Sequence, residues 1–272
     1  MKHTIGFPGL GLEFEVNRVA FTLFGRDIYW YGLIIVLGLV LGTVVALRNA
    51  KKIGMSADTI YDFLLWAIPL SVIGARIYYV ATKWSEYREH PISVLYLWEG
   101  GIAVYGSIIA AILTLLVFCK IKKIPAYDLL DCCCVGLILG QAVGRWGNFV
   151  NAEAYGTSTT LPWRMSLLEG GRMIEVHPTF LYESLWDFGV FVLLMVLFTR
   201  KRTFPGKVFW NYLLWYGIGR FFIEGLRTDS LYIGSLRISQ CVAALSVIVS
   251  VIMLFWLSKQ MKRNKEENPC ST

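Results

Sequence analysis

Seven long apolar runs constrain this sequence more than any other feature. Each is close to the roughly 20 helical residues that are needed to cross a hydrocarbon core about 30 Å thick. Hydrophobic residues make up 56% of the chain and charged residues only 17%, which is typical of integral membrane proteins. We therefore predict an all-α integral membrane protein, a bundle of seven transmembrane helices. The runs cover residues 29–47, 59–80, 102–119, 129–150, 179–198, 208–226 and 238–257.

The distribution of Lys and Arg predicts the orientation of the runs, because cytoplasmic loops carry an excess of both. Of the 26 Lys and Arg residues, 14 fall in the connections after the first, third and fifth runs and in the carboxyl-terminal tail. The amino terminus is therefore predicted outside and the tail inside. This topology also explains the net charge of +7, so we expect no nucleic-acid binding.

Three segments lie outside the membrane in this prediction. Residues 1–28 form an amino-terminal arm, too polar and too interrupted by Gly and Pro for a signal peptide; an arm along the outer membrane surface and a loosely ordered tail are both compatible with it. Between residues 29 and 257, the transmembrane domain has long outer loops at 81–101 and 151–178. The second is predicted to form a small outer cap with little regular structure of its own, and loops of this length are usually functional. Residues 258–272 form a basic cytoplasmic tail.

The cysteines do not indicate a metal site or a disulfide framework. Cys132, Cys133 and Cys134 are consecutive, and consecutive helical residues point about 100° apart. They cannot converge on one ion, so packing of small apolar side chains explains them better.

Three arginines lie within the runs or at their outer ends: Arg76, Arg145 and Arg220. A charged side chain at membrane depth costs about 2.5 kcal/mol or more, so such a residue indicates a functional site by default. Gln141, Arg145 and Asn148 stand at i, i+4 and i+7, on one face of a predicted helix. A structural alternative is that Arg145 pairs with a carboxylate to fix packing, and that Arg76 extends to the membrane interface.

The sixth run repeats this pattern. Tyr212, Tyr216, Arg220 and Glu224 are each four residues apart, so phenols, a cation and a carboxylate share one helix face. A structural Arg220–Glu224 ion pair explains this spacing as well as a functional site does. At the start of the fifth run, Glu183 is a candidate partner for an intramembrane arginine.

These residue types suit an anion that arrives from the lipid. Guanidinium groups bind phosphate through planar, always charged donors, and no His or Cys metal cluster or nucleotide-binding loop is present in the sequence. A phospholipid headgroup is the predicted ligand. The competing class is a non-enzymatic lipid or ion transporter with an arginine-lined pathway, although we find no internal repeat of the kind many transporters contain. A phospholipid phosphatase or synthase would be expected to show acidic metal-binding clusters or a His nucleophile.

Several ordered motifs resemble those of the bacterial prolipoprotein diacylglyceryl transferase family. The longest is GRWGNFVNAE at residues 144–153. The others are Trp30-Tyr31-Gly32, Gly74-Ala75-Arg76, Glu99-Gly100-Gly101, His177-Pro178, Tyr182-Glu183 and YGIGRFFIE at residues 216–224.

The resemblance implies a multi-pass enzyme of the bacterial cytoplasmic (inner) membrane. Such an enzyme transfers the sn-1,2-diacylglyceryl group of phosphatidylglycerol to the lipobox cysteine in the signal peptide of a preprolipoprotein. A thioether forms and glycerol phosphate leaves, in the first step of lipoprotein maturation. It also implies seven spans with the amino terminus outside, and no cofactor.

The resemblance also implies site residues. The expected catalytic residues are Arg145, Arg220, Glu153, Tyr105 and Tyr31. The expected phosphatidylglycerol-binding residues are Arg145, Asn148, Asn151, Gly156, Arg76, Glu224 and Tyr216. An acidic residue of the family that precedes the long motif matches Asp131.

Tyr105 departs from the family pattern, because many members have a histidine there that is proposed as the general base. The acceptor thiol, with a pKa near ~8.5, must lose its proton to attack, and a phenol with a pKa near ~10 accepts one poorly. Tyr105 is therefore expected to orient groups by hydrogen bonding, with Glu153 or a water as proton acceptor. The arginines stay protonated; they would hold the phosphate, stabilise its developing charge and lower the pKa of the thiol.

Overall fold

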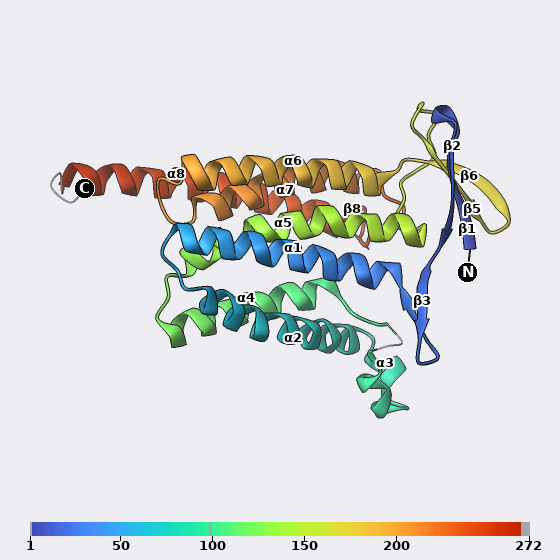
Figure 1. The fold of residues 1–272 in the computed structure, drawn as a ribbon, viewed down its shortest axis with the longest axis horizontal. Coiled ribbons are helices and arrows are strands. Elements are labelled where there is room, and N and C mark those ends of the chain that lie inside the picture. The colour runs from blue at the N-terminus through green and yellow to red at the C-terminus, as the bar shows by residue number, and fades with distance from the viewer. Residues whose placement is uncertain (1, 98–99, 268–272) are drawn as a thin grey trace. The chain divides into compact units, whose positions relative to one another are not determined.

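The computed structural model describes residues 2–97 and 100–267 and is mostly helical (Figure 1). Each predicted apolar run coincides with one long helix. Glu99, part of one of the motifs, and Cys270 lie outside the described residues. The long helices are α1 (Trp30–Lys52), α2 (Ala57–Thr82), α4 (Val104–Lys122), α5 (Ala126–Asn151), α6 (Thr179–Arg200), α7 (Lys207–Glu224) and α8 (Ile238–Glu267). The short helices are η1 (Pro8–Leu10), α3 (Trp84–Tyr87) and η2 (Pro91–Leu95).

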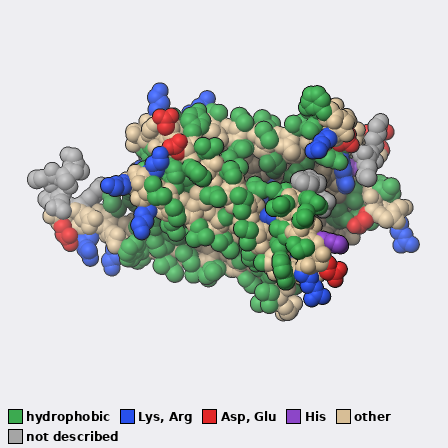
Figure 2. Space-filling view, turned by 90° about the horizontal axis from the view of Figure 1, so that it is seen from below, with side chains coloured by type: hydrophobic (Ala, Val, Ile, Leu, Met, Phe, Trp, Pro, Cys, Tyr) green, Lys and Arg blue, Asp and Glu red, His purple; other side chains and the backbone are tan. Residues whose placement is uncertain are grey.

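Within the described ranges, six helices are long and apolar enough to cross a membrane: α1, α2, α4, α5, α6 and α8. Only 17% of the most apolar window of α1 and 11% of that of α8 are buried inside the protein, so their hydrophobic side chains face outward, as lipid-facing helices require. Figure 2 shows hydrophobic side chains along the middle of one face, with Lys and Arg toward its ends. The protein is thus a multi-pass membrane protein. Helix α7 falls outside this set of six, since Lys207, Arg220 and Glu224 all lie within its 18 residues.

The chain divides into two compact units. The first comprises Met1–Ala46 and Leu130–Thr272, and the second comprises Leu47–Leu129. In the second unit, α2 and α4 pack closely where Gly74 faces Gly106. In the first unit, α7 packs against α6 and α8, and α1 packs against α5.

The contact between α1 and α5 depends on glycines. A Cβ atom on Gly136 would lie 2.2 Å from the main-chain oxygen of Gly42, and one on Gly38 would lie 3.0 Å from that of Gly140. Both helices therefore present a Gly-x-x-x-Gly pair, the spacing with which membrane helices bring their backbones together. This contact holds α5, which carries Arg145, against α1, which carries Tyr31.

Replacing Gly136 with alanine is expected to lower the unfolding temperature, because the new methyl group would overlap the backbone of α1. Overpacking of this kind typically costs about 1–3 kcal/mol. Thermal unfolding in detergent would measure the shift. Gly32→Ala, also in α1, is the matched control, since a Cβ there has no heavy atom within 4 Å. Equal stability of the two variants would contradict the close contact.

A four-stranded antiparallel sheet lies at one end of the helices of the first unit (Figure 1). Its order is β2 (Leu12–Asn17), β1 (Lys2–Phe7), β5 (Met165–Glu169) and β6 (Arg172–Val176). The amino-terminal arm and the loop at 151–178 thus form one structure, in which Ile5 pairs with Leu167. Two hairpins complete the strands: β3 (Val19–Leu23) with β4 (Arg26–Tyr29), and β7 (Tyr232–Ile233) with β8 (Leu236–Arg237).

The sheet corrects two predictions. The loop at 151–178 does have regular structure, and the all-α class omits these strands. The physical reason is that the paired strands β1 and β5 are more than 150 residues apart in the sequence, and the apolar residues of the two halves of the sheet share one core. Ile5, Phe7, Met165, Leu167 and Val176 form this core with Phe180 of α6.

This core seats the sheet on the ends of α5 and α6. Phe149 of α5 packs against Phe7 and Phe180, with ring centroids 6.5 and 5.0 Å apart. The His3 ring is hydrogen-bonded to the Val150 carbonyl at 2.8 Å. The last turn of α5 is therefore held by strand β1 as well as by α6.

Candidate active site

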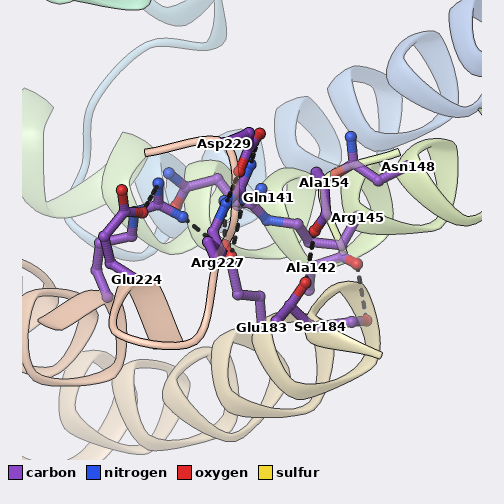
Figure 3. A network of polar contacts seen from close by, with 12 residues as sticks. Gln141, Ala142, Arg145, Asn148, Ala154, Glu183, Ser184, Glu224, Arg227 and Asp229 are labelled. Atoms are coloured by element: carbon purple, nitrogen blue, oxygen red, sulfur yellow. Dashed lines mark hydrogen bonds and ion pairs between the residues drawn. The ribbon is translucent and has the colours of Figure 1, made fainter. Parts of the chain in front are cut away.

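Glu183 is the centre of the polar cluster in the first unit (Figure 3). It lies in the second turn of α6 and is only 4% exposed. Arg145 of α5 forms an ion pair with it, Arg220 of α7 donates to it at 2.9 Å, and Arg227 donates at 3.2 Å. Two predicted site arginines from separate helices thus meet at one buried carboxylate, and Glu183 is confirmed as their partner.

The arginines differ in their remaining partners. Arg220 also pairs with Glu224 at 2.5 Å, which is the i, i+4 ion pair that the spacing predicts. Arg227 makes two bonds with Asp229, at 2.9 and 2.7 Å. Burial opposes the charge of Arg227, but these bonds and the charge of Glu183 raise its pKa above the ordinary value. The structural ion pairs foreseen for Arg145 and Arg220 are therefore both present.

Hydrogen bonds between α5 and α6 hold Arg145 opposite Glu183. The Ser184 hydroxyl donates to the Ala142 carbonyl at 2.8 Å, and the Trp146 indole donates to the Ser184 hydroxyl at 3.1 Å. Both bonds lie within one helical turn of the ion pair, so the two helices cannot slide past each other there without losing them.

The segment after α5 turns sharply around Glu153. Ala152 and Ala154 have φ values of +50° and +56°, a conformation that costs an L-residue roughly 1–2 kcal/mol. Neighbouring groups maintain it: the Thr179 hydroxyl donates to the Ala154 carbonyl at 2.5 Å, and the Asn148 amide donates to the Glu153 carboxylate at 3.0 Å. The predicted site residues Asn148 and Glu153 are thus in direct contact. The neighbouring Asn151 is held through its carbonyl, which accepts from Arg18 at 2.5 Å.

Gly156 lies where two other segments come closest. Its N–H donates to the His177 carbonyl at 3.0 Å, and Thr157 N–H donates to the Leu226 carbonyl at 2.8 Å. A Cβ atom on Gly156 would lie 2.7 Å from His177 Cβ and 3.1 Å from the Leu226 carbonyl oxygen. Only glycine fits without displacing the segment that carries Arg227, and the predicted role of Gly156 in phosphatidylglycerol binding stays a prediction.

The predicted tyrosines of the first unit line this region. The ring of Tyr31 packs on Gly147, where a Cβ atom would lie 2.5 Å from it, and it is close enough to Glu153 and Arg145 for electrostatic interaction. Tyr216 stacks on Tyr212, with centroids 5.7 Å apart and planes at 17°.

Arg76 and Tyr105 belong to the second unit. Tyr105 lies half-buried in the first turn of α4. Arg76 is 5% exposed, and its guanidinium donates to main-chain carbonyls of the loop before α4. These belong to Ser93, Val94, Tyr96, Gly100 and Gly101. Arg76 therefore holds that loop, and its role in lipid binding stays a prediction.

Asp131 lies far from the arginine cluster. It is 14 residues before Arg145 in the same helix, or about 21 Å along the axis. Its buried carboxylate accepts from Arg202 at 2.9 Å and from the N–H groups of Gly206 and Phe209 at 2.8 Å. Asp131 thus fixes the connection between α6 and α7.

An apolar cavity of about 490 Å³ opens beside the loop at 151–178. Its apolar lining suits a hydrocarbon group better than a charged one. His177 at its edge lies 3.2 Å from the Tyr182 hydroxyl, and burial lowers the pKa of His177. The lining comprises Leu161, Trp163, Leu181, Leu185 and Leu226 together with His177 and Tyr182.

Sequence reasoning did not identify Arg227 and Asp229 as site residues. Arg227 lies beyond the end of α7. Its spacing three residues after Glu224 was the available signal, and its contact with Glu183 depends on the turn that follows α7.

The fold and the site together define a multi-pass membrane protein with an arginine–carboxylate cluster beneath an antiparallel sheet. Residues 18–256 match the sequence model of the prolipoprotein diacylglyceryl transferase family. The chain belongs to this family.

Relatives named phosphatidylglycerol–prolipoprotein diacylglyceryl transferase cover nearly the whole chain. The protein of Finegoldia magna is 48% identical over 252 residues, which span 93% of this chain and 100% of the relative. That of Clostridioides difficile is 45% identical with the same coverage. That of Limosilactobacillus reuteri is 44% identical over 90% of this chain and 92% of the relative.

Proposed function

We propose that this protein transfers the sn-1,2-diacylglyceryl group of phosphatidylglycerol to the lipobox cysteine of preprolipoproteins. The names of its relatives state this donor and this acceptor class. The observation that carries the proposal is the meeting of Arg145 and Arg220 from separate helices at the buried Glu183. Such a cluster supplies fixed cations for a lipid phosphate, and the family membership does not favour the transporter alternative.

We also propose seven spans, with the sheet outside and the basic tail in the cytoplasm of a bacterial cell. The Lys and Arg distribution supports this orientation. Helix α7 supports the count, because it packs against α6 and α8 and its Arg220 and Glu224 are paired, which lowers the cost of charge at membrane depth. The sheet would then form the outer cap, and the cavity beside it would face the outer half of the bilayer.

The reaction requires a carbon–oxygen bond to break at the glycerol carbon that bears the phosphate. The cysteine sulfur attacks this carbon and forms the thioether, while the bonding electrons leave with the phosphate oxygen of glycerol phosphate. Arg145 and Arg220 would stabilise the negative charge that develops on this phosphate. Arg145 suits this role best, because it pairs with Glu183 through Nη2 and, in the described part of the chain, forms no second ion pair.

Glu153 is the proposed acceptor of the thiol proton. Glu153 is exposed, and its carboxylate accepts a hydrogen bond from the Asn148 amide. It lies close enough to Tyr31 for electrostatic interaction, as does Arg145. Tyr105 keeps the expected role of orienting groups by hydrogen bonding, since a phenol is a weak base at neutral pH.

The test is an assay of purified protein with phosphatidylglycerol vesicles and a lipobox peptide. Thioether product and glycerol phosphate are expected in equal amounts, as measured by mass spectrometry and phosphate analysis. A peptide with serine in place of cysteine is the control and should give neither product. Vesicle-to-vesicle movement of lipid without thioether formation would favour the transporter instead.

A further inference from the structure

We infer that Glu183 is a positioning residue that sets the geometry of the phosphate-binding arginines; the inference rests on the proposed function. Glu183 belongs to neither set of predicted site residues. Its carboxylate is nevertheless the point at which three guanidiniums converge (Figure 3).

Both oxygens of Glu183 are used. Oε2 pairs with Arg145, whereas Oε1 accepts from Arg220 at 2.9 Å and from Arg227 at 3.2 Å. The three cations come from α5, from α7 and from the turn after α7. One side chain on α6 therefore links α5, α7 and the turn after α7.

The three guanidiniums and the buried Glu183 carboxylate stabilise one another. Three guanidiniums that converge in a low-dielectric interior would repel one another without an anion between them. A carboxylate that is 4% exposed would equally be costly without cationic partners. The charge of Glu183 therefore stabilises the convergence of the three arginines, and Glu183 is the carboxylate that all three share.

The three arginines depend on Glu183 to different degrees. Arg220 is also held by Glu224 and Arg227 by Asp229. Among residues 2–97 and 100–267, Arg145 has Glu183 as its single ion-pair partner. Loss of the Glu183 charge should therefore release Arg145 first, and Arg145 is the arginine with donors left for a phosphate.

The experiment compares Glu183→Gln with Glu183→Asp in the full-length protein, with rates expressed per folded molecule from a monodisperse sample. Glu183→Gln is expected to lower kcat by about 30- to 100-fold, because a misplacement of about 1 Å can cost roughly 100-fold. The KM for phosphatidylglycerol should change by less than about threefold, since all three cations that attract the phosphate remain.

Glu183→Asp keeps the charge and is expected to recover part of the lost kcat, because its carboxylate still pairs with guanidinium groups; recovery stays incomplete, because the shorter side chain withdraws the carboxylate from the arginines. Glu175→Gln, which removes the exposed ion pair of β6 with Arg164, is the matched control and should leave both constants unchanged.

Three outcomes would overturn the inference: full kcat in Glu183→Gln, an increase in KM at constant kcat, or Glu183→Asp no better than Glu183→Gln. Each assumes that the unchanged protein makes thioether. If the unchanged protein makes none, the proposed function itself fails, so the two failures are distinguishable.

Discussion

Arg145→Ala is expected to lower the rate of thioether formation by about 100- to 1000-fold, the loss seen when a fixed donor to a developing oxyanion is removed. The structure explains why this arginine matters most. It enters the cluster from α5, its side chain keeps 20% of its surface exposed, and one of its nitrogens is committed to Glu183. The remaining donors can meet a phosphate with the planar geometry that guanidinium provides.

Initial rates at saturating phosphatidylglycerol would measure the effect of Arg145→Ala. Arg145→Lys should recover little activity, since an ammonium group keeps the charge but not the planar pair of donors. Arg164→Ala is the matched control, because Arg164 pairs with the half-exposed Glu175 on the sheet and lies outside the cluster. Arg145→Ala with an unchanged rate, in folded protein, would exclude Arg145 from the chemistry.

Gly156→Val is expected to lower turnover by roughly 100-fold through displacement of the surrounding backbone. The new side chain would collide with His177, Thr179 and Leu226, and Leu226 directly precedes Arg227. Displacement of about 1 Å near reacting groups costs about this factor, while overpacking itself destabilises by about 1–3 kcal/mol. The variant should therefore fold but work poorly.

Turnover and thermal unfolding should be measured together for Gly156→Val. Gly189→Ala is the control, because a Cβ on Gly189 of α6 has no heavy atom within 4 Å. Gly156→Val with normal turnover would show that the close approach of these segments has no role in catalysis.

Much of the membrane part was predictable because its determinants are local. A run of about 20 apolar residues specifies a helix by its own length and composition, and all seven runs are helices in the structure. The Arg220–Glu224 pair was equally accessible, since i, i+4 residues of one helix are neighbours in any fold. Helix α7 shows the limit of composition alone: three charges remove it from the set of apolar spans, although its helical structure was predicted.

Reasoning from neighbouring residues could not predict the sheet or the convergence of three arginines on Glu183. The register of β1 with β5 joins Ile5 to Leu167, and no periodicity within either segment selects the other as its partner. The contact of Arg227 with Glu183 was equally inaccessible, because it depends on the turn that follows α7.

The amino-acid sequence by itself determined that this is a membrane protein and which arginines enter its helices, because hydrophobicity and helical periodicity act over a few neighbouring residues. Only the tertiary structure decided that Arg145, Arg220 and Arg227 share Glu183. It also decided that strands β1 and β5, more than 150 residues apart in the sequence, pair in one sheet. Ion pairing and strand pairing act between whatever groups folding brings together, so their partners are specified by the packing of the whole first unit.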